Sequence, residues 1–224
     1  MHFGCAKAIA EHMKHKHLIF DFDGVLAETN NIRFEGFRLL FRDYPDDQVQ
    51  MLVEYAMLNG GMSRYEKIKY FFKEIRNEII SDASVQILSR QYTELVKQKV
   101  IDAEPVKGSL EFLSNNYTNY DFAIVSGSDQ EELREVCQAR KIYQLFLNIL
   151  GSPERKETNL SKLLLEEGWD KESCLFIGDS LNDLEAAQIN NIDFIARESG
   201  LVEWDSRVNI LVIKDLTQLQ SHVA

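Results

Sequence analysis

The feature that most limits the fold of this sequence is a series of short apolar runs that alternate with helical patterns. After Pro105, runs at 121–128, 145–151, 174–180 and 193–197 have the length and composition of strands, and amphipathic segments separate them. Strands that alternate with helices are joined by right-handed crossovers and form a parallel sheet with helices on both faces. The sequence therefore predicts an α/β fold built on a doubly wound (Rossmann-like) parallel sheet.

A long helical stretch interrupts this series near the amino terminus. Leu-Ile-Phe at 18–20 has the character of a buried first strand, but from about residue 30 onward apolar residues recur at helical spacings in four segments. We therefore predict two domains. The α/β core comprises residues 1–28 and 103–224, and an inserted all-helical cap domain comprises residues 29–102.

Charge and cysteine content exclude several classes of protein. The net charge is −11, which repels phosphate backbones, so we expect no nucleic acid partner. No apolar run approaches the roughly 20 residues of a membrane span. The three cysteines are an odd number, lie far apart and show no metal-ligand spacing, so we expect no structural zinc. Such cysteine usage is typical of a reduced protein of the cytoplasm. The sequence does not indicate the oligomeric state.

The first residues do not resemble a secretory signal. Lys7 and Glu11 interrupt any apolar segment there, which again favours a cytoplasmic location. Residues 1–12 are expected to form a helical extension, with Met13 as an alternative start. The role of the whole N-terminal extension, residues 1–16, cannot be read from the sequence.

Polar residues follow the predicted strands at one end. The first strand runs into two aspartates, the strand of 121–128 ends in Ser-Gly-Ser, and the strand of 174–180 ends in Gly-Asp-Ser. In open parallel sheets the carboxyl ends of the strands lie at one edge, where ligands bind. We therefore expect the following residues to meet at one place: Asp21, Asp23, Ser126, Gly127, Asp179 and Asp183.

A cluster of carboxylates needs a counter-charge. A buried carboxylate costs several kcal/mol unless it is paired or bound to a metal. Oxygen ligands without His or Cys, with positions left open for substrate and water, favour Mg²⁺ over zinc or copper. We expect Mg²⁺ as the cofactor, and its candidate ligands are Asp21, Asp23, Asp179 and Asp183. A metal beside a carboxylate nucleophile is suited to phosphoryl transfer.

Four motifs, in order, resemble those of the haloacid dehalogenase superfamily. Asp-Phe-Asp-Gly-Val-Leu at 21–26 matches the first motif, Ser126 ends the strand of the second, Lys156 is the candidate for the third, and Gly-Asp-x-x-x-Asp at 178–183 matches the fourth. The chain is most similar to the phosphatase and β-phosphoglucomutase branch, whose helical cap lies between the first two motifs. The resemblance implies a Rossmann-like core, a cap that closes over the site, and a phosphorylated substrate.

The resemblance also implies a role for each aspartate. Asp21 would attack phosphorus to give an aspartyl-phosphate, and Asp23 would protonate the leaving oxygen and then activate water. This requires Asp23 to be protonated when substrate binds, a state that burial and a neighbouring carboxylate favour. Asp21, Asp179 and the backbone carbonyl of Asp23 would bind Mg²⁺, and Asp183 would bind it directly or through water.

Three further residues would hold the phosphoryl group. The Ser126 hydroxyl and the Gly127 N–H would bind it at the start of a helix, where unpaired N–H groups attract anions. Lys156 would balance the charge of Asp21 and of the phosphate.

Alternatives stay open for several of these positions. Lys162 or, less favourably, Arg155 could take the place of Lys156. Residues 126–128 could serve only to cap the helix that follows them, and Asp183 could do the same for its own helix.

One loop of the predicted cap is a candidate for substrate selection. Gly-Gly-Met-Ser-Arg at 60–64 is similar to the substrate-contacting cap loop of the β-phosphoglucomutase branch. By that resemblance Arg64 would bind the far end of the substrate, for example a second anionic group; the alternative is an exposed arginine in a first helical turn. Arg33 and Lys67 are weaker candidates.

The aspartate at position 23 decides among the activities of the superfamily. Dehalogenases and phosphonatases lack an acid/base aspartate two residues after the nucleophile, whereas Asp23 is present here. The sequence therefore predicts an enzyme, a Mg²⁺-dependent phosphatase acting on a small phosphorylated metabolite such as a sugar phosphate or phosphoglycolate. A β-phosphoglucomutase-like phosphosugar mutase is the alternative, and a non-catalytic binding protein on this fold is less favoured.

Overall fold

The computed structural model describes residues 14–204 and 210–223. The expected helical extension of residues 1–12 and the alternative start at Met13 lie outside them. Six parallel strands form one sheet in the order β3-β2-β1-β4-β5-β6, which confirms the predicted α/β fold. The strands are β1 (His17–Phe20), β2 (Asp121–Asp129), β3 (Asn148–Ser152), β4 (Cys174–Gly178), β5 (Asp193–Arg197) and β6 (Leu211–Ile213).

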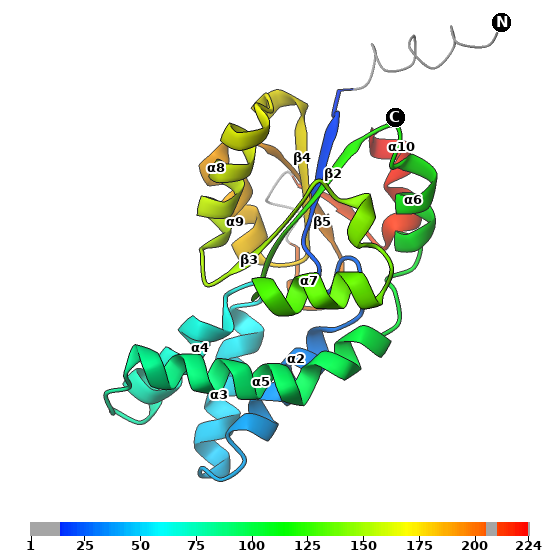
Figure 1. Cartoon of the computed structure of the whole chain (residues 1–224). Coiled ribbons are helices and arrows are strands. Elements are labelled where there is room, and N and C mark those ends of the chain that lie inside the picture. Colours follow the sequence, from blue (N-terminus) through cyan, green and yellow to red (C-terminus); the bar gives the residue numbers. More distant parts are fainter. Residues whose placement is uncertain (1–13, 205–209, 224) are drawn as a thin grey trace, which may run out of the picture.

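Successive residues of β1 pack on opposite faces of the sheet, as the two-residue period of a strand requires. Leu18 and Phe20 belong to an apolar cluster that includes residues of α6, α7 and α10, whereas Ile19 belongs to a second cluster with residues of α8 and α9. Figure 1 shows α6 and α10 on one side of the sheet and α8 and α9 on the other. The helices are α6 (Ser109–Asn116), α7 (Gln130–Ala139), α8 (Lys156–Glu167), α9 (Leu181–Asn190) and α10 (Gln220–Val223).

Short 3-10 helices complete this part of the chain. Their bounds are Tyr143–Leu145, Lys171–Ser173 and Leu216–Gln218.

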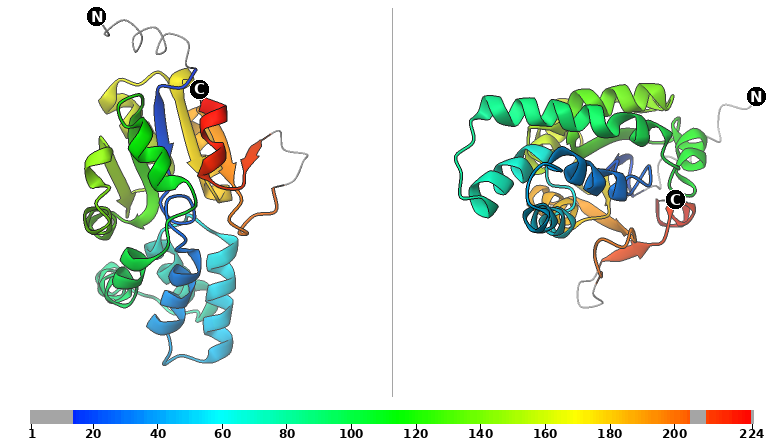
Figure 2. Two further views of the ribbon diagram at one scale, coloured as in Figure 1. Left: turned by 90° about the vertical axis from the view of Figure 1, so that its right-hand side faces the viewer. Right: turned by 90° about the horizontal axis from the view of Figure 1, so that it is seen from below.

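The four helical segments expected between the first strand and the rest of the sheet are present, and we call them the helical insert. Figures 1 and 2 show the insert beyond the carboxyl ends of the strands. Its aromatic core includes Phe37 against Tyr92 and Phe41 against Phe71. The helices of the insert are α2 (Asn30–Leu40), α3 (Asp46–Leu58), α4 (Arg64–Tyr70), which continues as a π-helical turn (Phe71–Ile75), and α5 (Asp82–Asp102).

Two chain segments join the helical insert to the sheet, and they run side by side. The Glu28 N–H donates to the Glu104 carbonyl at 2.9 Å, and the Val106 N–H donates to the Leu26 carbonyl at 3.1 Å. The two covalent connections between the insert and the sheet therefore lie side by side, as one pair of hydrogen-bonded segments. The division into a core of residues 1–28 and 103–224 and a cap of residues 29–102 stays a prediction.

No helix within residues 14–204 and 210–223 has both the length and the apolar character needed to cross a membrane.

Candidate active site

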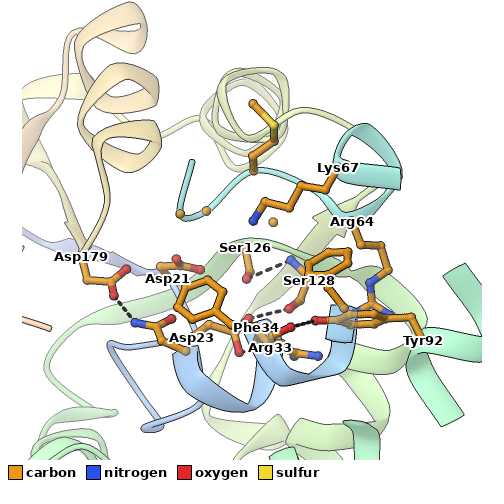
Figure 3. A pocket seen from close by; sticks show the side chains of 16 residues that line it. Asp21, Asp23, Arg33, Phe34, Arg64, Lys67, Tyr92, Ser126, Ser128 and Asp179 are labelled. Carbon is orange, nitrogen blue, oxygen red and sulfur yellow. Dashed lines mark hydrogen bonds and ion pairs between the residues drawn. The ribbon is translucent and has the colours of Figure 1, made fainter. Parts of the chain in front are cut away.

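The register of the sheet brings three strand ends to one edge. Phe20, the last residue of β1, pairs with Ile124 of β2 and with Ile177 of β4. Asp21 follows Phe20 directly, and Ser126 and Asp179 each lie two residues beyond the paired position. These side chains line one pocket between the edge of the sheet and the helical insert (Figure 3).

The structure places Lys156 beside Asp21. Lys156 is the first residue of α8, and its Nζ lies 3.1 Å from Asp21 Oδ2 and also contacts Asp183 Oδ1. All three side chains are almost completely buried. Lys162 instead pairs with Glu154 at 2.8 Å in an exposed ion pair. The side chain of Arg155 is likewise 75% exposed, so Lys156 is the cation that meets the carboxylates.

Three buried aspartates lie close together at this edge of the sheet. Asp21, Asp179 and Asp183 each offer an oxygen, and these oxygens lie within 4.8 Å of one another. Burial raises the pKa of Asp21 and of Asp179, and Lys156 offsets this only in part. An all-oxygen donor set with excess negative charge fits a hard divalent cation such as Mg²⁺.

Asp183 is already occupied by donors from its own chain. Its Oδ2 accepts from the Asp179 N–H at 3.2 Å, the Ser180 N–H at 3.0 Å and the Ser180 hydroxyl at 2.6 Å, while Oδ1 contacts Lys156. Ser180 and Asp183 form a capping box at the start of α9. The helix-capping alternative for Asp183 is therefore observed. The carboxylates with fewer donors, Asp21 and Asp179, fit a metal better.

Two local features aim Asp179 at the centre of the site. Asn30, the first residue of α2, donates from Nδ2 to Asp179 Oδ2 at 2.7 Å. Gly24 has φ +72°, and a Cβ there would lie 2.0 Å from Asp179 Oδ2. Only glycine allows both the turn after β1 and this close approach.

The surroundings of Asp23 differ from the expectation that they favour its protonated form. Arg33 Nε donates to Asp23 Oδ1 at 2.8 Å, the Thr29 hydroxyl to Oδ1 at 2.5 Å, and the Ser128 hydroxyl to Oδ2 at 2.5 Å. Burial acts to raise the pKa of Asp23, but these partners, Arg33 foremost, outweigh it and hold that pKa below its usual value. That part of the sequence-based reasoning was wrong, because it left out Arg33, which lies in α2 and reaches back to the Asp23 carboxylate.

The end of β2 also differs from the expectation of a helix start at the phosphate site. The cap of α7 is Asp129, whose Oδ1 accepts from the N–H groups of Glu131 and Glu132 at 3.1 Å each. Ser126 and Gly127 lie upstream, in the extended end of β2. Residues 126–128 are therefore not the helix cap, and any phosphate held by Ser126 and Gly127 binds at the strand end instead.

The helical insert rests directly on this strand end. A Cβ at Gly127 would lie 2.0 Å from the carbonyl oxygen of Gly61, in the loop between α3 and α4. A Cβ at Gly61 would lie 2.5 Å from Ser180 Oγ and 3.2 Å from Lys156 Nζ. The loop that the sequence singled out thus covers the polar ends of β2 and β4.

Arg64 lines the pocket but is paired with a residue that the sequence analysis missed. Its Nη1 donates to Glu132 Oε2 at 2.6 Å and to the Thr93 hydroxyl at 2.7 Å. Glu132 also contacts Arg33, so one glutamate of α7 binds two arginines of the insert. Glu132 lies beside Leu133 and Val136 on the buried side of α7. An acidic residue on an apolar helix face is the sequence signal that could have identified Glu132 as a buried partner of a cation.

Comparison with known proteins places the chain in a family. A family model described as haloacid dehalogenase-like hydrolase matches residues 18–197, from β1 to the end of β5. The chain belongs to the haloacid dehalogenase-like hydrolases. The resemblance inferred from the four motifs and the prediction of an enzyme are thereby confirmed. Among curated proteins, no sequence matches this haloacid dehalogenase-like hydrolase significantly.

Solved structures of low sequence identity share the fold along nearly the whole chain. A predicted phosphoglycolate phosphatase from Haemophilus somnus is 16% identical, covering 95% of this chain and 100% of that one, with a TM-score of 0.74. A mutant of CbbY from Rhodobacter sphaeroides, in complex with xylulose-1,5-bisphosphate, is 16% identical over 92% and 96% of the chains, with a TM-score of 0.73. A HAD-hydrolase, YfnB from Bacillus subtilis, bound to magnesium, is 18% identical over 94% and 99%, with a TM-score of 0.70.

Proposed function

We propose that this haloacid dehalogenase-like hydrolase is a cytoplasmic, Mg²⁺-dependent phosphatase of small phosphorylated metabolites, with the helical insert as its cap. The observation that carries the proposal is the pairing of Asp21 and Lys156, 3.1 Å apart, beside a pocket that Asp21, Ser126 and Asp179 line. A buried carboxylate, a fixed cation and a hydroxyl at one strand edge are suited to receiving a phosphoryl group. Sugar phosphates and phosphoglycolate-like compounds are the proposed substrates. The xylulose-1,5-bisphosphate held by the CbbY mutant and the description of the Haemophilus somnus protein support this class.

The first step joins Asp21 to the substrate phosphorus. An Asp21 carboxylate oxygen attacks, an Asp21–phosphorus bond forms, and the bond from phosphorus to the leaving oxygen breaks. Asp23 gives its proton to that oxygen. Lys156 offsets the charge that gathers on the phosphoryl oxygens, and the Ser126 hydroxyl and Gly127 N–H donate to them. Asp23 is held as an anion by Arg33, so the Arg33 contact must weaken before Asp23 can carry this proton.

The second step releases phosphate. Asp23, now an anion, takes a proton from water, and the resulting hydroxide attacks the phosphorus of the aspartyl-phosphate. The phosphorus–oxygen bond to Asp21 breaks, which restores the Asp21 carboxylate and frees inorganic phosphate. The Gly61 loop over Gly127 keeps other water away from the intermediate.

Asp21 and Asp179, with the backbone carbonyl of Asp23, would hold Mg²⁺. The ion would supply positive charge that orients the phosphoryl group and stabilises its negative charge. Asp183 would act on it through Ser180 and Lys156, because both Asp183 oxygens already have donors.

The experiment is phosphate release from a panel of sugar phosphates and phosphorylated small acids, with Mg²⁺ and with EDTA. Release that needs Mg²⁺ and that Asp21→Asn abolishes is the expected result. Asp82→Asn serves as the matched control, because the Asp82 side chain is 91% exposed and lies in the insert. Conversion of sugar phosphates into isomers without phosphate release would instead identify a mutase, and inactivity in both assays would contradict the enzymatic roles assigned here.

A further inference from the structure

Four cationic side chains surround the candidate active site, and all are buried. Arg33, Arg64 and Lys67 come from the helical insert and Lys156 comes from α8, with residue exposures of 8%, 4%, 6% and 4%. A buried cation is costly unless a carboxylate or another acceptor lies against it. The partner of each cation therefore indicates what that cation is for.

Three of the four cations have carboxylate partners within the protein. Arg33 bonds to Asp23, Arg64 to Glu132, and Lys156 to Asp21. Within residues 14–204 and 210–223, Lys67 Nζ has neither an ion pair nor a hydrogen bond. The Phe37 ring, whose centroid lies 6.0 Å from Nζ, is its aromatic neighbour. Burial lowers the pKa of Lys67 to about 7, against the attraction of Asp23.

The Lys67 side chain points into the pocket. Figure 3 shows it reaching from α4 toward the space beside Ser126, while Arg64, one turn earlier on the same helix, lies at the Tyr92 end. The guanidinium of Arg64 is stacked over the Tyr92 ring, 4.5 Å from its centroid, and is bonded to Glu132. Arg64 is thus held by the protein, whereas Lys67 has donors to offer a ligand.

We propose that Lys67 binds a second anionic group of the substrate, and that the enzyme therefore selects phosphate monoesters that carry a carboxylate or a second phosphate. The inference rests on the proposed phosphatase function and deepens it. The reacting phosphoryl group already has Lys156, Ser126 and Gly127, so Lys67 is left for another part of the same molecule. An anion there would give Lys67 the partner that it lacks among the described residues.

The test uses three two-carbon phosphate esters that differ only at the far end. These are 2-phosphoglycolate, ethylene glycol monophosphate and ethylene glycol bisphosphate, which end in a carboxylate, a hydroxyl and a phosphate. Each is assayed with wild type, Lys67→Met, Lys67→Arg and the control Lys69→Met, which alters a half-exposed lysine of the same helix. Thermal unfolding of each variant shows that it is folded.

Lys67→Met is expected to lower kcat/KM for an anionic ester by ~10- to 100-fold, mainly through KM, and to change the hydroxyl ester less than ~3-fold. Lys67→Arg should retain most of the preference, and Lys69→Met all of it. A loss for the carboxylate ester alone, or for the bisphosphate alone, supports the inference and identifies the anion. An equal loss for all three esters, or no loss for either anionic ester, overturns it.

Binding of phosphonate analogues, measured by calorimetry, separates this inference from the proposed function. The same three end groups are compared in compounds that cannot be hydrolysed. If no ester releases phosphate from wild type, the phosphatase proposal fails. A weaker affinity of Lys67→Met for the anionic phosphonates alone would still support the Lys67 site. Equal affinities of wild type and Lys67→Met for them would overturn it.

Discussion

Arg64 of the helical insert and Glu132 of α7 form an ion pair that joins the insert to the rest of the protein, with Nη1 and Oε2 2.6 Å apart. The Glu132 side chain is fully buried, and Arg33, also of the insert, contacts its other oxygen. Burial opposes the charge on Glu132, but the two arginines outweigh it and lower the pKa of Glu132 to about 2. One carboxylate thus fixes two cations of the insert.

Glu132→Gln is expected to lower the free energy of unfolding by about 3 kcal/mol at pH 7, because it leaves two buried arginines without their anion. The carboxylate stabilises the fold fully above its unfolded-state pKa near 4.5, and that contribution is lost as the pH falls toward 2. The difference in the free energy of unfolding between wild type and Glu132→Gln should therefore disappear between pH 5 and pH 2. Urea unfolding across this range measures it.

The control for this prediction is Glu135→Gln, one turn further along α7. Glu135 pairs with Lys97 at 2.8 Å, but its side chain is 58% exposed. Such surface pairs contribute about 0–1 kcal/mol. If Glu132→Gln lowered the free energy of unfolding no more than Glu135→Gln does, the bond between the insert and α7 would be unimportant for stability.

Lys67→Met is expected to stabilise the protein at pH 6, by up to about 4 kcal/mol, because wild type buries an unpaired ammonium group there. The pKa of Lys67 is lowered to about 7 from an ordinary value of 10.5, so the folded protein loses this proton earlier than the unfolded chain. Wild type therefore gains stability between pH 7 and pH 10.5, and the gap to the variant narrows over that range. Chemical unfolding at pH 6 and pH 10 tests this, and a variant no more stable at pH 6 would count against an unpaired charge.

Arg33→Gln is expected to raise the pKa of Asp23, because Arg33 is the main partner that lowers it. As the proposed acid, Asp23 must be protonated, so activity falls as the pH rises above its pKa. The alkaline limb of kcat/KM should therefore move to higher pH in the variant. A limb at the same pH, with activity lower throughout, would assign Arg33 a structural role only.

Substitution of the two aspartates of the fourth motif should have different consequences. Asp179→Asn removes a proposed ligand and is expected to weaken Mg²⁺ binding by ~100-fold. Asp183→Asn alters only residues around the ligands, so it should weaken Mg²⁺ binding by ~10-fold. Asp183→Asn should also lower the melting temperature, because it breaks the cap of α9 and the contact with Lys156. Calorimetric titration with Mg²⁺ measures both affinities, and equal losses would indicate that Asp183 is a direct ligand.

Gly127→Ala is expected to keep the insert away from the end of β2, because the new Cβ would lie 2.0 Å from the Gly61 carbonyl oxygen. The proposed phosphatase activity should fall by two orders of magnitude or more, with little change in melting temperature. The control is Gly60→Ala, whose nearest neighbour, 3.0 Å away, is the movable side chain of Leu201. Small-angle scattering should show a longer particle for Gly127→Ala alone.

The sheet and the strand-end residues could be predicted because their signals are local. A buried run followed by Asp21, or by Ser126, marks a strand and its carboxyl end, and the parallel topology then brings those ends together. Lys156 was identified by its order among the motifs, and it lies within reach of Asp21 as expected.

The charge state of the pocket could not be predicted, because it depends on contacts between distant segments. Glu132 lies 99 residues from Arg33 along the chain. Nothing in the spacing of either indicates that they meet. From the sequence alone, Arg64 is the better candidate to bind a ligand and Lys67 the weaker one, because the bond between Arg64 and Glu132 is not visible there. The pKa of Asp23 is likewise expected to be raised, whereas in the structure Arg33 lowers it.

The paired connectors between the sheet and the helical insert limit how the pocket can open. Because Glu28 is bonded to Glu104 and Leu26 to Val106, the two connectors lie along one line, which could serve as a single axis for movement of the insert. A rotation about this line would separate the Gly61 loop from Gly127, and it would also draw Arg33 away from Asp23 and Arg64 away from Glu132. Such an opening would admit the substrate and, by removing Arg33, would raise the proton affinity of Asp23.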